Sequence, residues 1–119
     1  MDSILISVKK SMGIAEECED FDDELILFIN SVFSTLNQLG VGPETGFAIQ
    51  DDIANWSDYL NDDLNLNSVK TYVCLKVKLM FDPPSSSTVI EAINREIKEL
   101  EWRINVAVDI VKEDEDVEV

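Results

Sequence analysis

The stretch Phe81-Asp82-Pro83-Pro84-Ser85-Ser86-Ser87-Thr88 separates two amphipathic helix patterns and decides the fold. Neither proline fits a helix interior, because each lacks an N–H and its ring clashes with the preceding turn. The Ser/Thr run that follows supplies side-chain oxygens to cap a new helix, and Thr88 with Glu91 matches the S/T-x-x-E capping box. One helix is therefore expected to end at Phe81 and another to begin near Thr88.

The pattern after the prolines predicts a long helix over about 88–112. Its apolar residues recur at spacings of three and four, which forms a narrow seam of the kind that packs on other helices. The seam consists of Ile90, Ile93, Ile97, Leu100, Ile104, Ala107 and Val111. About 25 residues at ~1.5 Å each span ~37 Å, roughly the diameter of a domain of this size. The last turns are therefore expected to project and to need cover from a neighbouring subunit. The alternative is that the helix folds back over its own bundle.

Four shorter amphipathic patterns precede the prolines, at residues 3–12, 24–39, 53–60 and 66–81. Their apolar residues recur every three or four positions, as on one face of a helix, whereas strand-like alternation is sparse. The sequence thus predicts an all-α fold, a small bundle of about five helices with a long C-terminal helix in one domain, 1–112. A dense like-charge block follows it, and such blocks usually fray into solvent, so 113–119 is expected to be an acidic flexible tail.

The expected helix starts rest on acidic residues. Asp20 or Asp22 is placed to cap the second helix, and Asp51 or Asp52 to cap the third, because a carboxylate can accept hydrogen bonds from the first free backbone N–H groups. Between these helices, residues 45–50 alternate apolar and small or polar side chains, which favours a short extended piece.

The composition is strongly acidic. In 119 residues, 25 Asp and Glu stand against 9 Lys and Arg, for a net charge of −16. Binding to a phosphate backbone or to an anionic membrane surface needs clustered Lys and Arg, and the chain has no such cluster. No apolar run reaches the 18 or so residues of a membrane span, and no leader is evident, so an intracellular protein is expected. The acidic surplus serves either solubility alone or a face that meets a basic partner or repels DNA.

Residues that carry most enzyme chemistry are missing. The chain has no histidine, which excludes Ser-His-Asp and Cys-His catalysis, and no glycine-rich phosphate loop of the G-x-x-x-x-G-K type. Cys18 and Cys74 do not form a C-x-x-C pair, so no zinc site is expected. We expect no catalytic residue, no metal and no cofactor. A pair of carboxylates acting with a metal is the rival that these absences leave open.

Trp102 and Arg103 lie beside the seam of the long helix. One interpretation is an aromatic ring packed at the edge of the bundle and covered by the arginine. The other is an anchor for a partner, since Trp and Arg are enriched at interface hot spots.

Three blocks of the sequence together resemble the head–tail connector (adaptor, or head-completion) family of tailed bacteriophages. The first runs from Ile4-Leu5 to Gly13-Ile14 and through an acidic linker into Phe21-Asp22-Asp23-Glu24-Leu25. The second contains Ile29-Asn30-Ser31-Val32-Phe33 with Leu36, Leu39, Gly40, Val41 and Gly42. The third runs from Val69 to Leu79, through Phe81-Asp82-Pro83-Pro84, to Glu99-Leu100-Glu101-Trp102-Arg103-Ile104. The resemblance covers about residues 4–107, and the acidic tail has no counterpart in it.

The resemblance implies a non-enzymatic virion structural protein at the head–tail interface, which stays in the host cytoplasm until assembly. Members of this family form a homo-oligomeric ring, typically with twelve-fold symmetry, beneath the portal protein. The ring extends the channel through which DNA passes without specific binding, and it docks a stopper or tail-completion protein. Acidic residues that line such a channel would keep the phosphate backbone from adhering. By position, the expected partner-binding residues are Trp102, Arg103, Val106, Ile110 and Val111 on the long helix, and Gly40, Val41 and Gly42 in the turn.

A rival function follows from the charge alone. An acidic intracellular regulator, or a DNA mimic, would cover a basic protein surface, and its binding would weaken as salt is added. Such a protein would be a stable monomer or dimer, whereas the connector interpretation predicts assembly into a ring or with a portal.

Overall fold

The computed structural model describes residues 3–43, 45–60 and 66–117, and of residues 66 and 109–117 it describes the backbone alone. Five helices make up this part of the chain. They are α1 (Ile4–Ser11), α2 (Asp22–Gln38), α3 (Trp56–Leu60), α4 (Leu66–Phe81) and α5 (Ser87–Val117). The prediction of an all-α bundle of about five helices is confirmed. The described residues form no strand, only a single isolated bridge between Ser3 and Asn55.

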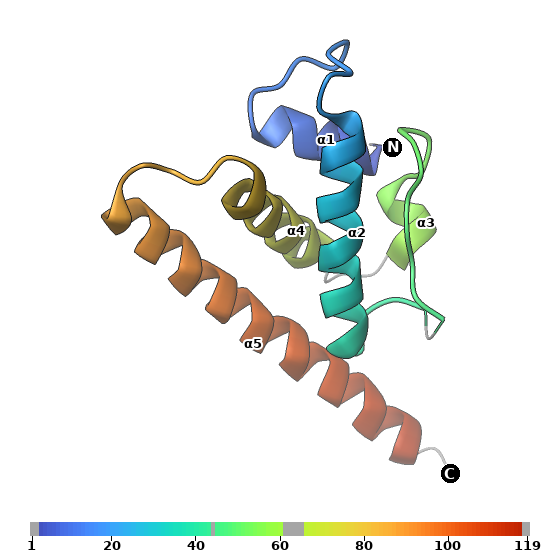
Figure 1. The fold of residues 1–119 in the computed structure, drawn as a ribbon. Helices are drawn as coiled ribbons and strands as arrows, with labels where there is room; N and C mark the ends of the chain where they lie inside the picture. Colours follow the sequence, from blue (N-terminus) through green and yellow to red (C-terminus); the bar gives the residue numbers. More distant parts are fainter. Residues whose placement is uncertain (1–2, 44, 61–65, 118–119) are drawn as a thin grey trace.

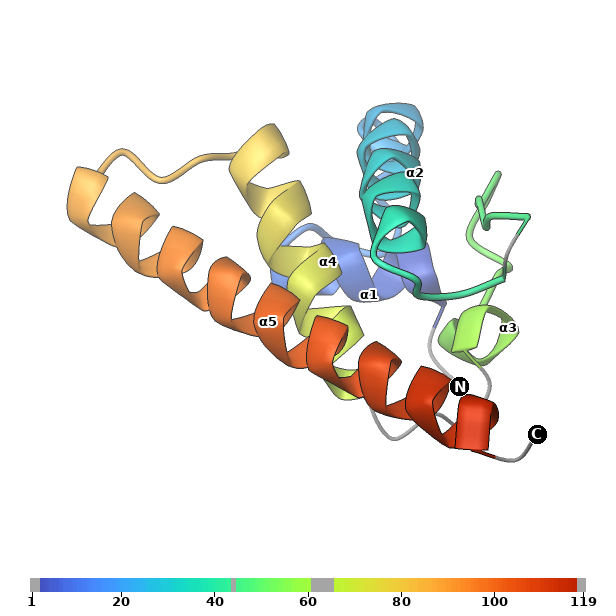
Figure 2. The ribbon, with the colours of Figure 1, turned by 90° about the horizontal axis from the view of Figure 1, so that it is seen from below.

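Helix α4 is the centre of the bundle. It packs against α2 on one side and α5 on the other, with α1 and α3 against it as well (Figures 1 and 2). Its Val69, Tyr72, Val73 and Val77 are almost completely buried. Because their spacing is three, one and four, these residues lie on one face of the helix, and the partly buried Cys74, Leu75 and Leu79 widen that face where the neighbouring helices pack on it.

The remaining core comes from one face of each surrounding helix. The buried residues of α1 are Ile4, Leu5 and Val8; those of α2 are Leu25, Ile29, Val32, Phe33 and Leu36; those of α5 are Ile97, Leu100 and Ile104. In α2 these are the positions that the four-and-three spacing predicted.

The seam of α5 packs on its own chain. Ile97, Leu100 and Ile104 are buried where α5 meets α4. For these three residues the helix packs on its own bundle, because the hairpin formed at the double proline brings α4 against them. That the last turns need cover from a neighbouring subunit stays a prediction, since the side chains from residue 109 on lie outside the described residues. The end of α5 nevertheless projects beyond the end of α2 (Figure 1).

The predicted C-terminal boundary of this helix is wrong. Helix α5 does not end at Lys112 but continues to Val117, over 31 residues. No proline or glycine follows Lys112, and glutamate is a good helix former, so nothing local stops the backbone there. Whether 113–119 acts as a separate tail stays a prediction.

The predicted caps of three helices are also wrong, although α5 begins at Ser87, next to the expected Thr88. Ser86, not Thr88, caps α5, since its Oγ accepts the Val89 N–H at 3.4 Å, while Thr88 already lies inside the helix. Helix α2 has Phe21 at its cap position and no side-chain cap; Asp22 is instead its first helical residue. The first turn of α2 contains three acidic residues, and their negative charge interacts favourably with the positive end of the helix dipole.

Helix α3 begins later than predicted. Asp51 Oδ1 accepts the Ile53 N–H at 2.9 Å in a local turn, so neither Asp51 nor Asp52 caps the helix. The helix begins after Asn55, whose N–H is bonded at 2.9 Å to Asp58 Oδ2 in the first turn. Because the start has shifted, Ile53 lies outside the helix and is exposed.

The segment 45–50, expected to be extended, forms no strand because no second strand is beside it. The side-chain amide of Asn30 makes the hydrogen bonds that a second strand would make. Its Nδ2 donates to Ile49 O at 2.9 Å, and its Oδ1 accepts the Ile49 N–H at 2.8 Å. Both backbone groups of Ile49 are thereby satisfied, which allows its side chain to be buried against α2.

Candidate interaction surface

Trp102 lies on the outward face of α5. Its side chain is 67% exposed, and that of Val106, one turn further on, is 37% exposed. Residues four apart lie on the same face of a helix, and Trp102 lies between the buried Leu100 and Ile104, on the side opposite to both. An exposed tryptophan on a helix whose other face is buried is a surface available to a partner.

Arg103 does not cover Trp102. Its Nη2 lies 2.6 Å from Glu99 Oε1, and both side chains are well exposed. The interpretation of an aromatic ring packed at the edge of the bundle under an arginine is therefore wrong. The part of α5 that carries Trp102 is held against the bundle. The Tyr72 hydroxyl on α4 donates to Glu101 Oε1 on α5 at 2.9 Å and so joins the two helices. The same burial and the Glu101 carboxylate raise the pKa of Tyr72 above its ordinary value.

The three predicted partner-binding residues in the turn after α2 differ in accessibility. Gly40 is exposed, Val41 is buried in the core, and Gly42 packs against the ring of Tyr59. Of the three, the structure leaves only Gly40 open to a partner and gives the other two a place in the fold. The side chains of Ile110 and Val111 lie outside the described residues.

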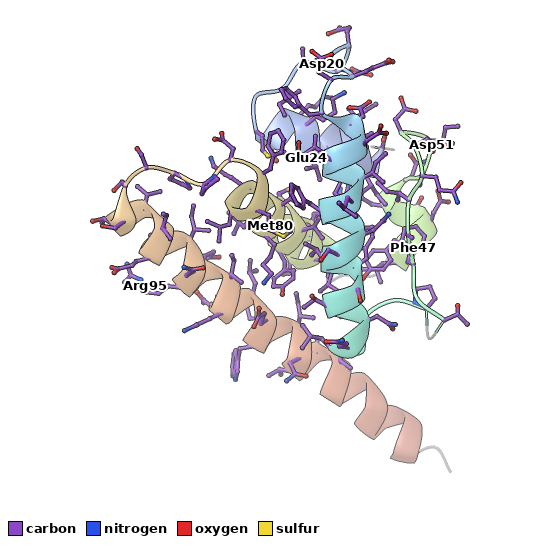
Figure 3. All side chains as sticks on the ribbon, viewed as in Figure 1. Asp20, Glu24, Phe47, Asp51, Met80 and Arg95 are labelled. Atoms are coloured by element: carbon purple, nitrogen blue, oxygen red, sulfur yellow. The ribbon has the colours of Figure 1, made fainter. Side chains whose placement is uncertain are left out.

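An open depression lies between α2 and the loop that follows it, and the sequence did not predict it. Its lining residues are Asn30, Phe33, Ser34, Asn37, Thr45, Gly46, Phe47 and Ala48 (Figure 3 labels Phe47). Amide and hydroxyl groups supply its polarity, and none of the described residues that line it has a titratable side chain. These groups can donate and accept hydrogen bonds.

The structure also bears on metal binding and on membrane insertion. Among the described side chains, no three Asp, Glu or Cys residues come together in a geometry that would hold a metal ion. Of the helices described, none is long and apolar enough to cross a bilayer.

Among the exposed apolar residues, Ile53 differs most from its predicted position. It is 75% exposed in the loop before α3, although the apolar pattern had assigned it to the buried face of a helix. Its acidic neighbours Asp51 and Asp52 are exposed as well. A turn signal was present, since Asp residues favour local side-chain turns over helix interiors.

Comparison with known families decides what this helical chain is. A family model described as phage connector protein matches residues 4–111. The chain belongs to the phage connector protein family. The resemblance seen in the sequence is thus confirmed over nearly the whole chain. No curated protein and no solved structure matches it.

Membership in the phage connector family supports a general role as a structural protein of the phage particle. Such connectors contact portal or tail proteins, and the family is generally non-enzymatic. A connector needs surfaces for other proteins more than it needs a pocket, and the outward face of α5, where Trp102 and Val106 are exposed, is a candidate for that purpose.

Proposed function

We propose that this protein is a head–tail connector that forms a ring beneath the portal, extends the DNA channel and docks the next head-completion or tail protein. The observation that carries the proposal is the outward face of α5, where Trp102 and Val106 are exposed on a helix that is anchored to the bundle by its opposite face. Tryptophan is enriched among the residues that contribute most to protein interfaces, and here its backbone is already ordered.

The projecting end of α5 supports contact with a second protein. At ~1.5 Å per residue the helix is ~46 Å long, close to the 50 Å of the longest dimension of the molecule. Its C-terminal turns can therefore reach a protein beside the bundle without any rearrangement of the core. We place the portal at this end, with twelve copies as the expected ring.

The acidic charge supports passage of DNA without binding. With a net charge of −16 per chain, a ring of copies presents a negative potential to the phosphate backbone. Replacing channel-facing acidic residues with lysine should therefore slow or trap DNA transit. Unchanged packaging and ejection would count against a channel lined by this protein.

The test is electron microscopy of the full-length protein mixed with the portal protein encoded by the same genome. We expect ring-shaped density on one face of the portal, and we expect the double variant Trp102→Ala/Val106→Ala to reduce its occupancy at least about tenfold, as for loss of an interface anchor. Leu27→Ala is the matched control, because Leu27 is also 67% exposed but lies on α2. If the protein does not bind the portal, but binds basic proteins with an affinity that falls as salt is added, it is the acidic regulator instead.

A further inference from the structure

Charge is unevenly distributed along this chain. Residues 1–68 contain fourteen Asp and Glu against two Lys, whereas residues 69–112 contain six acidic residues against seven Lys and Arg. The net charge of −16 thus comes from the first half and the last residues, while α4 and most of α5 are close to neutral. The acidic first part of the chain and its nearly neutral second part therefore offer a second copy surfaces of different charge.

In the acidic part of the chain, the loop before α3 presents an apolar residue next to two charged ones. We call Asp51, Asp52 and Ile53 the acidic knob. Asp51 Oδ1 accepts the Ile53 N–H at 2.9 Å, which fixes the backbone at the point where Ile53 is 75% exposed. A side chain presented by an ordered turn loses less conformational entropy on binding than one on a mobile loop.

On the other side, α5 presents an aromatic residue beside positive charges. Lys98 and Arg95 precede Trp102 by four and seven residues and so share its face of the helix. We call these three residues the basic patch. Both cations are exposed, and neither forms an ion pair with any side chain that the structure describes. Arg103 and Glu99 are bonded to each other and are not counted in the patch. The exposed Glu91 and Glu96 also lie on α5, Glu91 one turn before Arg95 and Glu96 on a different face from Trp102.

The acidic knob and the basic patch lie on opposite sides of the molecule. Figure 3 shows Asp51 on the loop beyond α2 and Arg95 on the outer side of α5, with α2 and α4 between them. The same order of elements is seen from below (Figure 2). The two surfaces therefore cannot meet within one copy. Two unlike patches on opposite sides make a heterologous contact, which closes into a ring when it is repeated around an axis.

We propose that the acidic knob of one copy packs against the basic patch of the next, with Ile53 against Trp102 and the aspartates beside the cations. This inference rests on the proposed function, because it names the contact by which the ring forms. A second copy is favoured over another partner because this chain itself carries both the apolar and the charged half of the match. The end of α5 beyond the patch stays available to the portal.

The test uses two charge-reversal variants of the full-length protein. Asp51→Lys/Asp52→Lys makes both surfaces basic, and Arg95→Glu/Lys98→Glu makes both acidic. Each variant alone should need at least about tenfold more protein than the wild type to fill the portal, since like charges across an interface oppose association. An equimolar mixture should recover occupancy, because each variant's altered surface is complementary to the other's and the copies alternate around the ring.

The readout is the number of copies per portal, counted by native mass spectrometry and by electron microscopy. Glu16→Lys/Glu17→Lys is the matched control, because it changes the charge equally in an exposed loop outside both surfaces. Thermal unfolding should change little in all variants, since every altered residue is exposed and the only described hydrogen bond lost is the exposed one from the Ile53 N–H to Asp51 Oδ1.

Three outcomes would overturn the contact. If both variants fill the portal like the wild type, or if the mixture does not recover, the ring forms through other surfaces while the connector function stands. If the wild type itself forms no multi-copy complex with the portal, the proposed function fails, and this contact fails with it.

Discussion

The ammonium group of Lys9 on α1 lies 2.9 Å from Asp22 Oδ1 at the start of α2. The lysine side chain is almost fully buried, and its Nζ also donates to Glu16 O at 3.0 Å and to Cys18 O at 2.6 Å. The Lys9 ammonium group thus binds two backbone carbonyls of the acidic loop between α1 and α2 and one carboxylate at the start of α2, and it holds this loop against α1. Asp22 Oδ1 accepts no well-aligned hydrogen bond, so this approach is ionic.

Replacing Lys9 with methionine should destabilise the protein by ~2–4 kcal/mol. Methionine fills a similar volume but leaves two loop carbonyls and a partly buried carboxylate without their cation. Chemical denaturation monitored by circular dichroism measures the loss. Lys10→Met is the control, because Lys10 is the adjacent exposed lysine and its replacement should change stability by no more than about 0.5 kcal/mol. Equal effects of the two variants would show that the buried contacts of Lys9 contribute nothing.

The sequence predicted the helices well because their apolar spacing is regular, as in Leu25, Ile29, Val32 and Leu36 of α2. It also predicted where the chain reverses, because Pro83 and Pro84 exclude a helix whatever surrounds them. These signals are local. The helix starts were less predictable, since several Asp, Ser and Thr residues compete for each cap and packing decides among them.

The candidate surface could be predicted only in part. Trp102 was singled out from its residue type and its place beside the seam, and the structure leaves it exposed. Val41 was proposed with it, but the turn after α2 folds inward and buries it. The ion pair of Lys9 could not be predicted, because it depends on how the loop between α1 and α2 returns to α1. For Ile53, Asp51 and Asp52 did give a turn signal, but the apolar spacing favoured a helix instead.

Gly42 should tolerate no side chain, whereas Gly13 should tolerate one at modest cost. Both have positive φ, +87° and +74°, which L residues rarely adopt. A Cβ at Gly42 would lie 2.6 Å from Cε1 of the buried Tyr59 ring, while one at Gly13 would meet nothing within 4 Å. Gly13→Ala should therefore cost ~1–2 kcal/mol from backbone strain, and Gly42→Ala clearly more. Thermal unfolding of the two variants compares them, and equal losses would mean that the Tyr59 contact is unimportant.

Tyr59 and Tyr72 should respond in opposite ways to removal of the hydroxyl. The buried Tyr59 hydroxyl has no hydrogen-bond partner in the described structure, so Tyr59→Phe should leave stability unchanged or raise it by up to ~1 kcal/mol. Tyr72 donates to Glu101, so Tyr72→Phe should cost ~1 kcal/mol. Denaturation at neutral pH tests both; a loss of stability in Tyr59→Phe as large as in Tyr72→Phe would contradict the assignment.

The two tyrosines also predict how stability changes in alkali. Burial raises the pKa of Tyr59, and burial together with Glu101 raises that of Tyr72, both above the ordinary value of 10.0. The unfolded chain therefore loses these protons first, and the stability they contribute is complete below pH 10 and declines as the pH rises beyond it. The double variant Tyr59→Phe/Tyr72→Phe should show a shallower decline above pH 10. An identical slope in the wild type would mean that these hydroxyls do not stay protonated in the fold.

Trp102 and Leu100 should separate binding from folding on the same helix. Leu100 is buried against α4, so Leu100→Ala should cost ~2–5 kcal/mol through the cavity it leaves. Trp102 is exposed on the opposite side, so Trp102→Ala should change the free energy of unfolding by no more than about 0.5 kcal/mol while it weakens assembly on the portal. Denaturation curves and portal occupancy, measured on the same preparations, give the two quantities. If Trp102→Ala unfolds the protein as readily as Leu100→Ala does, the indole supports the fold and the outward face of α5 loses its claim as an interface.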